Sequence, residues 1–194
     1  MRYIETICVN DGEIKYLEYH LRRVESTIGR TLPIQQLDVP ETMREGKVKM
    51  RIVYSRQEGI EEVSFENYRI KTISHLQCVD IGSYSYSHKQ ENRAYLNALH
   101  AACAPQEDAL LIKNGFVSDT TFCNIVFLKK GNLYTPDTPL LAGTCRARLL
   151  DEHKIQAIPI RVEEIPTFEK AYLINAMIGV KELIVDIANI HIEK

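Results

Sequence analysis

Three short stretches of the 194-residue chain hold side chains that could carry chemistry. Lys89 lies at a predicted strand-to-helix junction, where its amine could enter a cleft and act as a nucleophile or general base. Asp119 ends one predicted strand and begins the connection to the next. The segment 143–146, Gly-Thr-Cys-Arg, precedes a predicted helix, whose exposed N–H groups and dipole favour an anion. Taken singly, Lys89 is also typical of solvated surface, Asp119 of a turn and Thr144 of a helix N-cap.

Several large enzyme classes are excluded by the motifs that the sequence lacks. It contains no G-x-S-x-G, no H-E-x-x-H, no P-loop and no G-x-G-x-x-G. The six histidines are scattered without metal-ligand spacing, so we expect no metal site. The five cysteines are widely spaced with no C-x-x-C, which favours buried thiols over a disulfide framework.

Composition and charge point to a small-molecule partner. The chain has 24 basic and 26 acidic residues and a formal charge of −2, without a long basic block, so we expect no nucleic-acid partner. Its apolar runs are far shorter than the roughly 20 residues of a membrane-spanning helix. The N-terminus lacks a signal-peptide core, and we therefore expect a cytoplasmic protein without a membrane partner.

The N-terminal part of the chain predicts a small α+β domain. Residues 3–9 read as a strand, and the turn pair Asp11-Gly12 leads to a second short strand. Apolar residues at helical spacing predict a helix over 17–28 that Gly29 ends. Residues 48–54 alternate apolar and basic side chains, which predicts a half-buried strand that pairs with residues 61–68.

The remainder predicts a larger, β-rich domain. A strand over 73–81 precedes a helix over 91–104, and two hairpins follow, 109–117 and 124–134. After a helix from Thr144 to about His153, strands are expected at 156–162, 170–174, 183–187 and 189–192. We place the boundary between residues 1–72 and 73–194, so the predicted fold class is α+β with two domains.

The N-terminal half carries motifs that resemble a known enzyme family. The opening motif of this family is similar to the residues Ile4-Glu5-Thr6-Ile7 followed by Asp11-Gly12 and then His20-Leu21-Arg22-Arg23. Its K-x-x-N-R element is similar to Lys89-Gln90-Glu91-Asn92-Arg93.

The C-terminal half continues the resemblance in the same order. Asp119 stands five residues before Asn124-Ile125-Val126-Phe127, like the acidic residue of the family. Gly143-Thr144-Cys145-Arg146 resembles a Gly-Ile-Thr-Arg turn, and Ile174-Asn175-Ala176-Met177 resembles a late strand and loop. On these motifs the chain is identified as a member of the class IV aminotransferases, pyridoxal-phosphate enzymes of fold type IV similar to D-amino-acid aminotransferase.

The resemblance implies a role for each matching residue. Lys89 would bind the aldehyde of pyridoxal phosphate and then act as the general base. Asp119 would pair with the pyridine nitrogen of the cofactor, and Arg23 would contact its phosphate.

The remaining cofactor contacts implied by the resemblance lie late in the chain. The backbone N–H groups of Thr144 and Cys145 would bind the phosphate, with Asn175 and Ala176 close to phosphate and substrate. Sites in this family resemble clefts at a dimer interface, so the resemblance implies a homodimer.

Two departures from the family pattern bear on these roles. Asp119 stands where the family usually has Glu, so a shorter side chain must reach the same nitrogen. The chain also begins at the strand over 3–9, so the N-terminal domain is expected to be shortened and the substrate side to be open.

The reaction is left open between two routes that share the cofactor residues. We favour 4-amino-4-deoxychorismate lyase, which releases pyruvate and 4-aminobenzoate for folate biosynthesis, because the chain is short and its motifs resemble the lyase branch. The alternative is transfer of an amino group from a branched-chain or D-amino acid. A binding protein that has lost activity is the third interpretation, and Lys89 argues against it. In each case we expect a small-molecule amine as the substrate or ligand.

Overall fold

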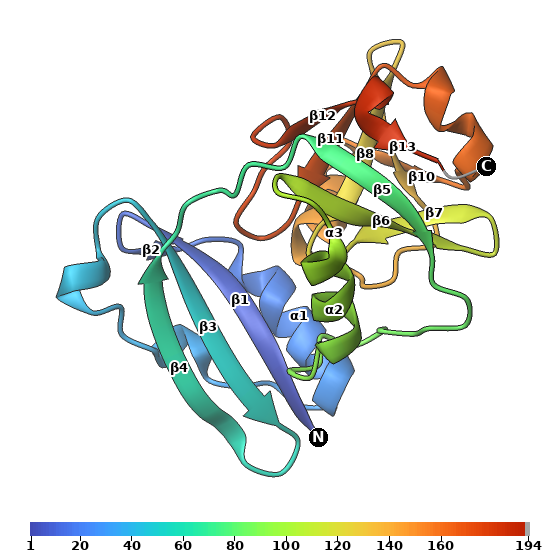
Figure 1. Cartoon of the computed structure of the whole chain (residues 1–194). Coiled ribbons are helices and arrows are strands. Elements are labelled where there is room, and N and C mark those ends of the chain that lie inside the picture. The colour runs from blue at the N-terminus through green and yellow to red at the C-terminus, as the bar shows by residue number, and fades with distance from the viewer. Residues whose placement is uncertain (193–194) are drawn as a thin grey trace. The chain divides into compact units, whose positions relative to one another are not determined.

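The computed structural model describes residues 1–192 and divides them into two compact units. The first unit comprises residues 1–70 together with 88–92, and the second comprises 71–87 and the described chain from Arg93 onward. Both units are built on a β-sheet with helices, which confirms the predicted α+β class (Figure 1).

The first unit is an antiparallel sheet covered on one face by a helix (Figure 1). Its strands lie in the order β2-β1-β3-β4 and have these bounds: β1 Arg2–Asn10, β2 Glu13–Ile14, β3 Lys47–Ser55 and β4 Gly59–Asn67. Helix α1 spans Leu17–Ile28, as the periodicity predicted, and Gly29 ends it with a φ of 75°. Short 3-10 turns at Ile34–Gln36 and Glu41–Met43 connect α1 to β3.

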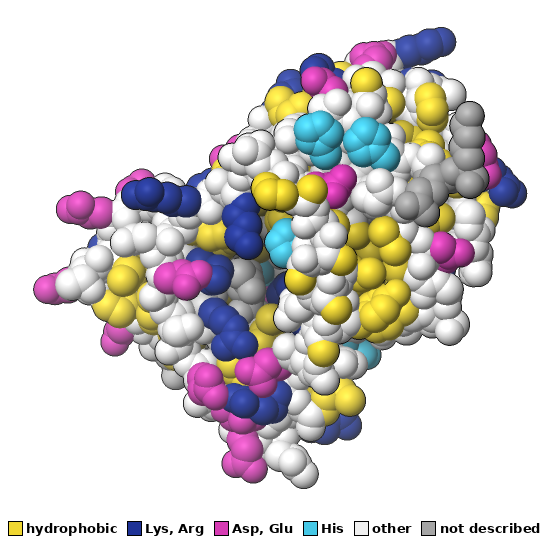
Figure 2. Space-filling model, in the orientation of Figure 1, with side chains coloured by type: hydrophobic (Ala, Val, Ile, Leu, Met, Phe, Trp, Pro, Cys, Tyr) yellow, Lys and Arg dark blue, Asp and Glu magenta, His cyan; other side chains and the backbone are white. Residues whose placement is uncertain are grey.

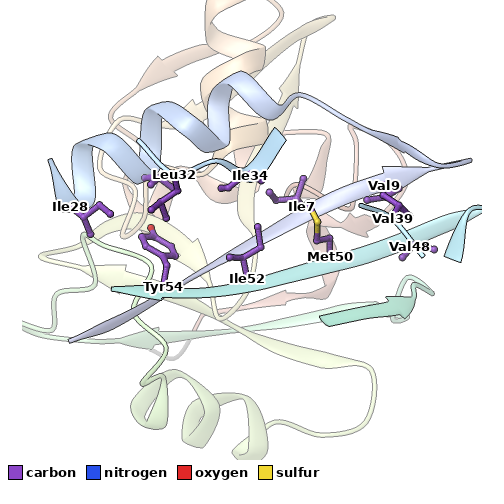
Figure 3. Close-up of a cluster of buried hydrophobic side chains, with 11 residues drawn as sticks. Ile7, Val9, Ile28, Leu32, Ile34, Val39, Val48, Met50, Ile52 and Tyr54 are labelled. Carbon is purple, nitrogen blue, oxygen red and sulfur yellow. The ribbon is translucent and has the colours of Figure 1, made fainter. Parts of the chain in front are cut away.

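The core of the first unit lies between α1 and the sheet (Figure 3). Ile7 and Val9 of β1 and Met50 and Ile52 of β3 are fully buried there, because alternate side chains of a strand point to the same face. Val24 contributes the matching apolar side of α1. This burial confirms the half-buried strand that the sequence predicted over residues 48–54.

The opposite face of the sheet carries charged side chains of both signs (Figure 2). Lys49 of β3 pairs with Glu66 of β4, and Arg51 pairs with Glu91 at 3.1 Å. The first ion pair joins neighbours on adjacent strands, and the second joins β3 to the segment 88–92 of the same unit. Both pairs neutralise a basic residue of β3.

Residues 88–92 belong to the first unit although they lie well beyond its other residues in sequence. The Ile4 N–H donates to the Lys89 carbonyl at 2.9 Å, and the Glu91 N–H donates to the Arg2 carbonyl at 3.1 Å. The sequence predicted two continuous domains, 1–72 and 73–194, whereas the first unit of the structure also includes this later segment, which pairs with the free edge of β1.

The second unit is a larger mixed sheet (Figure 1). Its strands follow the order β10-β9-β8-β7-β6-β5-β13, and β11 pairs with both β8 and β12. Their bounds are β5 His75–Asp80, β6 Glu107–Lys113, β7 Phe116–Thr120, β8 Asn124–Lys129, β9 Asn132–Pro136, β10 Gln156–Ile158, β11 Lys170–Ile174, β12 Ile184–Asp186 and β13 Ile190–His191.

Two α-helices pack in the second unit, α2 over Ala94–Ala102 and α3 over Thr144–Asp151. Helix α2 is shorter than the predicted 91–104, because residues 89–91 are extended along β1. The predicted strand over 156–162 ends at Ile158, and a 3-10 turn over Val162–Thr167 follows, with Pro166 inside it. A last 3-10 turn spans Ile187–Asn189.

The structure also bears on membrane insertion. Among the described residues, no helix has the length and apolar character needed to cross a membrane.

Candidate active site

Lys89 is positioned by its own backbone within the first unit. Its carbonyl accepts the Ile4 N–H, and the next residue, Gln90, forms an isolated antiparallel bridge with Tyr3. The side chain is half-buried. These contacts with β1 fix the backbone at the lysine and at the residue that follows it.

Arg23 lies in the same unit and is held by a buried carboxylate. Its Nε and Nη2 donate to the two oxygens of Glu5 at 2.8 and 2.5 Å. His20, one turn earlier on α1, contacts Glu5 Oε2 through Nδ1 at 2.6 Å. Glu5 and His20 are almost completely buried, so the guanidinium is oriented by a fixed partner.

The charges of this group follow from burial and pairing. Burial alone would raise the pKa of Glu5, but the Arg23 charge and the hydrogen bonds from His20 and Arg23 lower it to about 2. Burial lowers the pKa of His20 and outweighs the hydrogen bond and charge of Glu5, which raise it; the charges of Arg23 and Lys89 lower it as well. His20 is therefore neutral at pH 7 and donates from Nδ1, because an ionised carboxylate can only accept.

Asp119 lies in the second unit at the end of β7, and both its oxygens are hydrogen-bonded. Oδ1 accepts the amide of Asn124 at 2.7 Å, and Oδ2 accepts the Leu141 N–H at 2.9 Å. Burial raises the pKa of the Asp119 carboxyl to about 6. These hydrogen bonds and the charge of Arg146 limit the rise, so the carboxylate is the majority form at pH 7.

Asn124 sits directly opposite Asp119, because the two residues pair across the β7–β8 hairpin. Its Nδ2 donates both to Asp119 and to the Leu141 carbonyl, the latter at 3.0 Å. Its Oδ1 lies against Gly143, where a Cβ would come within 1.9 Å of that oxygen. Only glycine therefore fits at position 143 while Asn124 keeps this position.

Helix α3 begins beside this group. The N-cap is Gly143 rather than Thr144, so the helix has no side-chain cap, and the N–H groups of Thr144 and Cys145 belong to its first turn. The side chains of both residues are buried. The start of the helix thus offers backbone donors and the positive end of a dipole.

Asn175 and Ala176 form the turn that follows β11. Ile174 pairs with Asn124 of β8, which brings this turn next to the β7–β8 hairpin. The Asn175 amide donates to the Cys123 sulfur at 3.2 Å, and its Oδ1 accepts the Met177 N–H at 2.8 Å. Asn175 is therefore a turn-forming side chain, and Ala176 is half-buried beside it.

The structure thus sorts the predicted site residues by unit. Lys89 and Arg23 lie in the first unit, where both influence His20. The second unit contains the residues predicted to bind ring nitrogen, phosphate and substrate: Asp119, Thr144, Cys145, Asn175 and Ala176. Among the described residues, no group of His, Cys, Asp or Glu side chains is arranged to hold a metal ion.

The sequence interpretation did not assign a role to the buried partners of these residues. Arg146 is buried, donates to the Pro136 carbonyl at 2.8 Å and acts on Asp119 by its charge. The sequence did contain a sign that Glu5 is buried. It shares one face of β1 with Ile7 and Val9, because every second residue of a strand points to the same side. A carboxylate among apolar residues must have a partner.

The fold and these side chains define an α+β enzyme scaffold that presents a lysine, a buried carboxylate and a helix N-terminus. The sequence matches the family model of amino-transferase class IV over residues 3–183. The chain therefore belongs to this family and is an enzyme of the class, which confirms the resemblance drawn from its motifs.

Matches to two related proteins cover most of the chain. A Haemophilus influenzae protein named only as uncharacterized is 32% identical over 184 residues, which cover 90% of this chain and 97% of the relative. The crystal structure of a Haemophilus somnus 129PT protein, provisionally assigned as a 4-amino-4-deoxychorismate lyase, is 29% identical with a TM-score of 0.74. That match covers 92% of this chain and 97% of the other.

A Mycobacterium tuberculosis protein shows the same fold at lower identity. It is described as a hypothetical aminotransferase, crystallised with α-ketoglutarate and PMP, and is 18% identical with a TM-score of 0.74. The match covers 99% of this chain and 83% of that protein. These neighbours confirm the fold of type IV pyridoxal-phosphate enzymes.

Proposed function

We propose that the protein binds pyridoxal phosphate and acts as a 4-amino-4-deoxychorismate lyase. The observation that carries the cofactor assignment is the set of charged and polar groups. A lysine amine, an arginine held by a buried carboxylate, an ionised carboxylate and an uncapped helix start match the aldehyde, phosphate and ring nitrogen of this cofactor. When bound, the cofactor supplies an electron sink for the carbanion formed at the substrate carbon.

Each residue then has a task that its surroundings support. Lys89 Nζ would hold the aldehyde of the bound cofactor, and its free amine would accept a proton from the substrate carbon. The Asp119 carboxylate would keep the ring nitrogen of the cofactor protonated. It is suited to this because its hydrogen bonds with Asn124 and Leu141 offset part of the cost of burying a charge.

Phosphate binding is assigned to one side chain and to two backbone groups. Arg23 contributes a positive charge oriented by Glu5, and the N–H groups of Thr144 and Cys145 contribute backbone donors. We place Asn175 and Ala176 near the phosphate and the substrate.

Support for the lyase over the alternative is the Haemophilus somnus structure, which matches nearly the whole chain. Proton abstraction by Lys89 would be followed by loss of enolpyruvate and return of that proton to the leaving group. The second candidate is amino transfer, because the family model is that of the aminotransferases.

A paired assay decides between the two reactions. Purified, cofactor-loaded protein is given aminodeoxychorismate, with pyruvate release as the readout, and in parallel a panel of L- and D-amino acids with 2-oxoglutarate. We expect rapid pyruvate release with little amino transfer. Transfer without pyruvate release would establish the aminotransferase instead.

The site of cofactor attachment is tested separately. After borohydride reduction, peptide mass spectrometry is expected to find the cofactor on Lys89, and Lys89→Ala is expected to lose covalent attachment and at least about 1,000-fold in activity. Lys154→Ala, which removes an exposed lysine paired with Glu152, serves as the matched control. Modification of another lysine would contradict the assignment.

We also propose that the enzyme is a cytoplasmic homodimer that acts on a small-molecule amine, as the family resemblance implies. Light scattering on the purified protein measures its mass directly. A mass twice that of the 22.3 kDa chain would support the dimer, and a monomer with full activity would contradict it.

A further inference from the structure

We propose that Asn124 is the positioning residue for Asp119: it fixes the direction of the carboxylate, keeps it ionised, and ties it to the start of α3 across a gap that only glycine at position 143 leaves open. This inference rests on the proposed function, because it concerns the carboxylate assigned to the ring nitrogen.

The first step of the argument is the orientation of the Asn124 amide. Its Nδ2 lies 2.7 Å from Asp119 Oδ1 and 3.0 Å from the Leu141 carbonyl oxygen. Both neighbours are acceptors, so the nitrogen rather than the oxygen of the amide must face them. Asn124 is buried, so water does not compete for these two hydrogen bonds.

The second step is the chemistry of the carboxylate. Asp119 is buried, and burial by itself favours its protonated form. A protonated acid could not hold a proton on the ring nitrogen of the cofactor. The hydrogen bond from the Asn124 amide is stronger to an ionised carboxylate than to a neutral acid, and it therefore favours the form that the reaction needs.

The third step is the link to α3. The Leu141 backbone donates to Asp119 through its N–H and accepts from Asn124 through its carbonyl. Leu141 lies two residues before the N-cap Gly143. Asn124 and Leu141 thus hold the carboxylate at a fixed position relative to the start of α3. Such a fixed spacing would suit a rigid cofactor whose ring nitrogen meets the carboxylate and whose phosphate meets the helix start.

The fourth step is the fit of Gly143 against Asn124. A Cβ at position 143 would lie 1.9 Å from Asn124 Oδ1 and 3.1 Å from its Cγ. The φ of Gly143 is −70°, a conformation open to any residue. The requirement for glycine therefore comes from the Asn124 side chain and not from the backbone.

The test follows the titration of Asp119 in the full-length apoprotein. The carboxyl signal of Asp119 is identified by 13C NMR as the one absent from Asp119→Asn, and its midpoint is measured in each variant. Asn124→Leu, which has a similar volume and no donor, is expected to raise the midpoint by about one pH unit. Ser118→Ala is the control, because Ser118 is buried on the same strand but donates to the Thr138 carbonyl.

A pair of further variants separates charge from steric fit. Gly143→Ala is expected to lower the unfolding temperature and to raise the Asp119 midpoint, because the new Cβ displaces the Asn124 amide. In the double variant with Asn124→Ala, the space is free again. We expect its stability to return to that of Asn124→Ala alone, while the midpoint remains raised.

Two results would overturn the proposal. One is a midpoint in Asn124→Leu and Asn124→Ala within about 0.3 pH unit of the wild type, as for a residue with a purely structural role. The other is additive destabilisation in the double variant. Both measurements need no cofactor. A wild-type apoprotein that fails to bind pyridoxal phosphate would contradict the proposed function and leave the pairing of Asn124 and Asp119 supported.

Discussion

Two buried carboxylates in this protein respond to their surroundings in opposite ways. Glu5 is paired with a guanidinium and a histidine, so its pKa falls to about 2. Asp119 has only neutral hydrogen-bond donors and a more distant charge, so burial dominates and its pKa rises to about 6. The number of opposing charges in direct contact, rather than burial, separates the two residues.

The Glu5 carboxylate is expected to stabilise the fold above pH 4.5. Its folded pKa is below the unfolded value, so its contribution of about 3 kcal/mol is fully present above that value and is lost as the pH falls toward 2. Glu5→Gln should remove this pH dependence and lower stability at pH 7, because Arg23 loses its partner. Urea unfolding from pH 3 to pH 7 measures it, and the exposed Glu25→Gln should match the wild type.

The Asp119 carboxylate is expected to have the opposite effect. Its folded pKa is above the unfolded value, so ionisation costs the folded apoprotein about 3 kcal/mol, a penalty that develops between pH 4 and pH 7. The unfolding free energy of Asp119→Asn relative to wild type should therefore rise over this range. A flat difference curve would show that Asp119 titrates normally. The same variant should lose turnover, which would place stability and function in conflict at this residue.

At the scale of elements, alternation along β1 and β3 determines which side chains reach the core. Residues 48, 50, 52 and 54 are fully buried against α1, whereas the residues between them near the start of β3 are basic and only partly buried. The strand thus separates an apolar face from a charged face, and a one-residue change of register would exchange them.

Removing one core side chain should reveal the contribution of this packing. Ile52 is fully buried, and Ile52→Ala should lower the free energy of unfolding by about 2–5 kcal/mol, because the cavity cannot fully close. Ile184 is 44% exposed, and Ile184→Ala should cost less than about 1 kcal/mol. Denaturant titration compares the two. Equal losses would contradict the burial of Ile52.

At the scale of the whole molecule, the first unit is discontinuous in sequence. It is completed by residues 88–92, which carry Lys89. Residues 71–87 of the second unit come before this segment, so the first unit can be completed only after they have been synthesised. The chain therefore passes between the two units three times. The lysine assigned to the cofactor is thereby held by the unit that also contains Arg23.

Among the described residues the five cysteines form no disulfide, and their burial predicts low reactivity. Burial raises the pKa of the Cys78 and Cys103 thiols to about 11 and also raises that of Cys145. At pH 8 a thiolate with pKa 11 is about 100-fold less populated than one with pKa 9. A disulfide reagent should therefore modify the native protein slowly, and Cys103, the partly exposed thiol, should react first.

Comparison of native, unfolded and Cys103→Ser protein checks this expectation. The unfolded chain should release five equivalents of the reporter group, one for each cysteine. The Cys103→Ser variant should lose the fastest phase of the native reaction. A thiol that reacts in the native protein as rapidly as in the unfolded chain would contradict the burial described here.

The sequence by itself determined the local features of this protein. Periodicity placed α1 and β3, because apolar spacing follows directly from helix and strand geometry. It also placed Asp119 at a strand end and Thr144 at a helix start, since both depend on neighbours a few residues away. The motif order indicated the family, which the match over residues 3–183 confirms.

Only the tertiary structure decided which distant residues meet. The return of residues 88–92 to β1, the pairing of Glu5 with His20 and Arg23, and the contact of Asn124 with Gly143 all join segments that lie apart in the chain. Such contacts depend on how sheets and helices pack, and no local pattern encodes them. The same packing sets the two buried pKa values, because the charges and donors that reach a carboxylate are fixed only once the chain has folded.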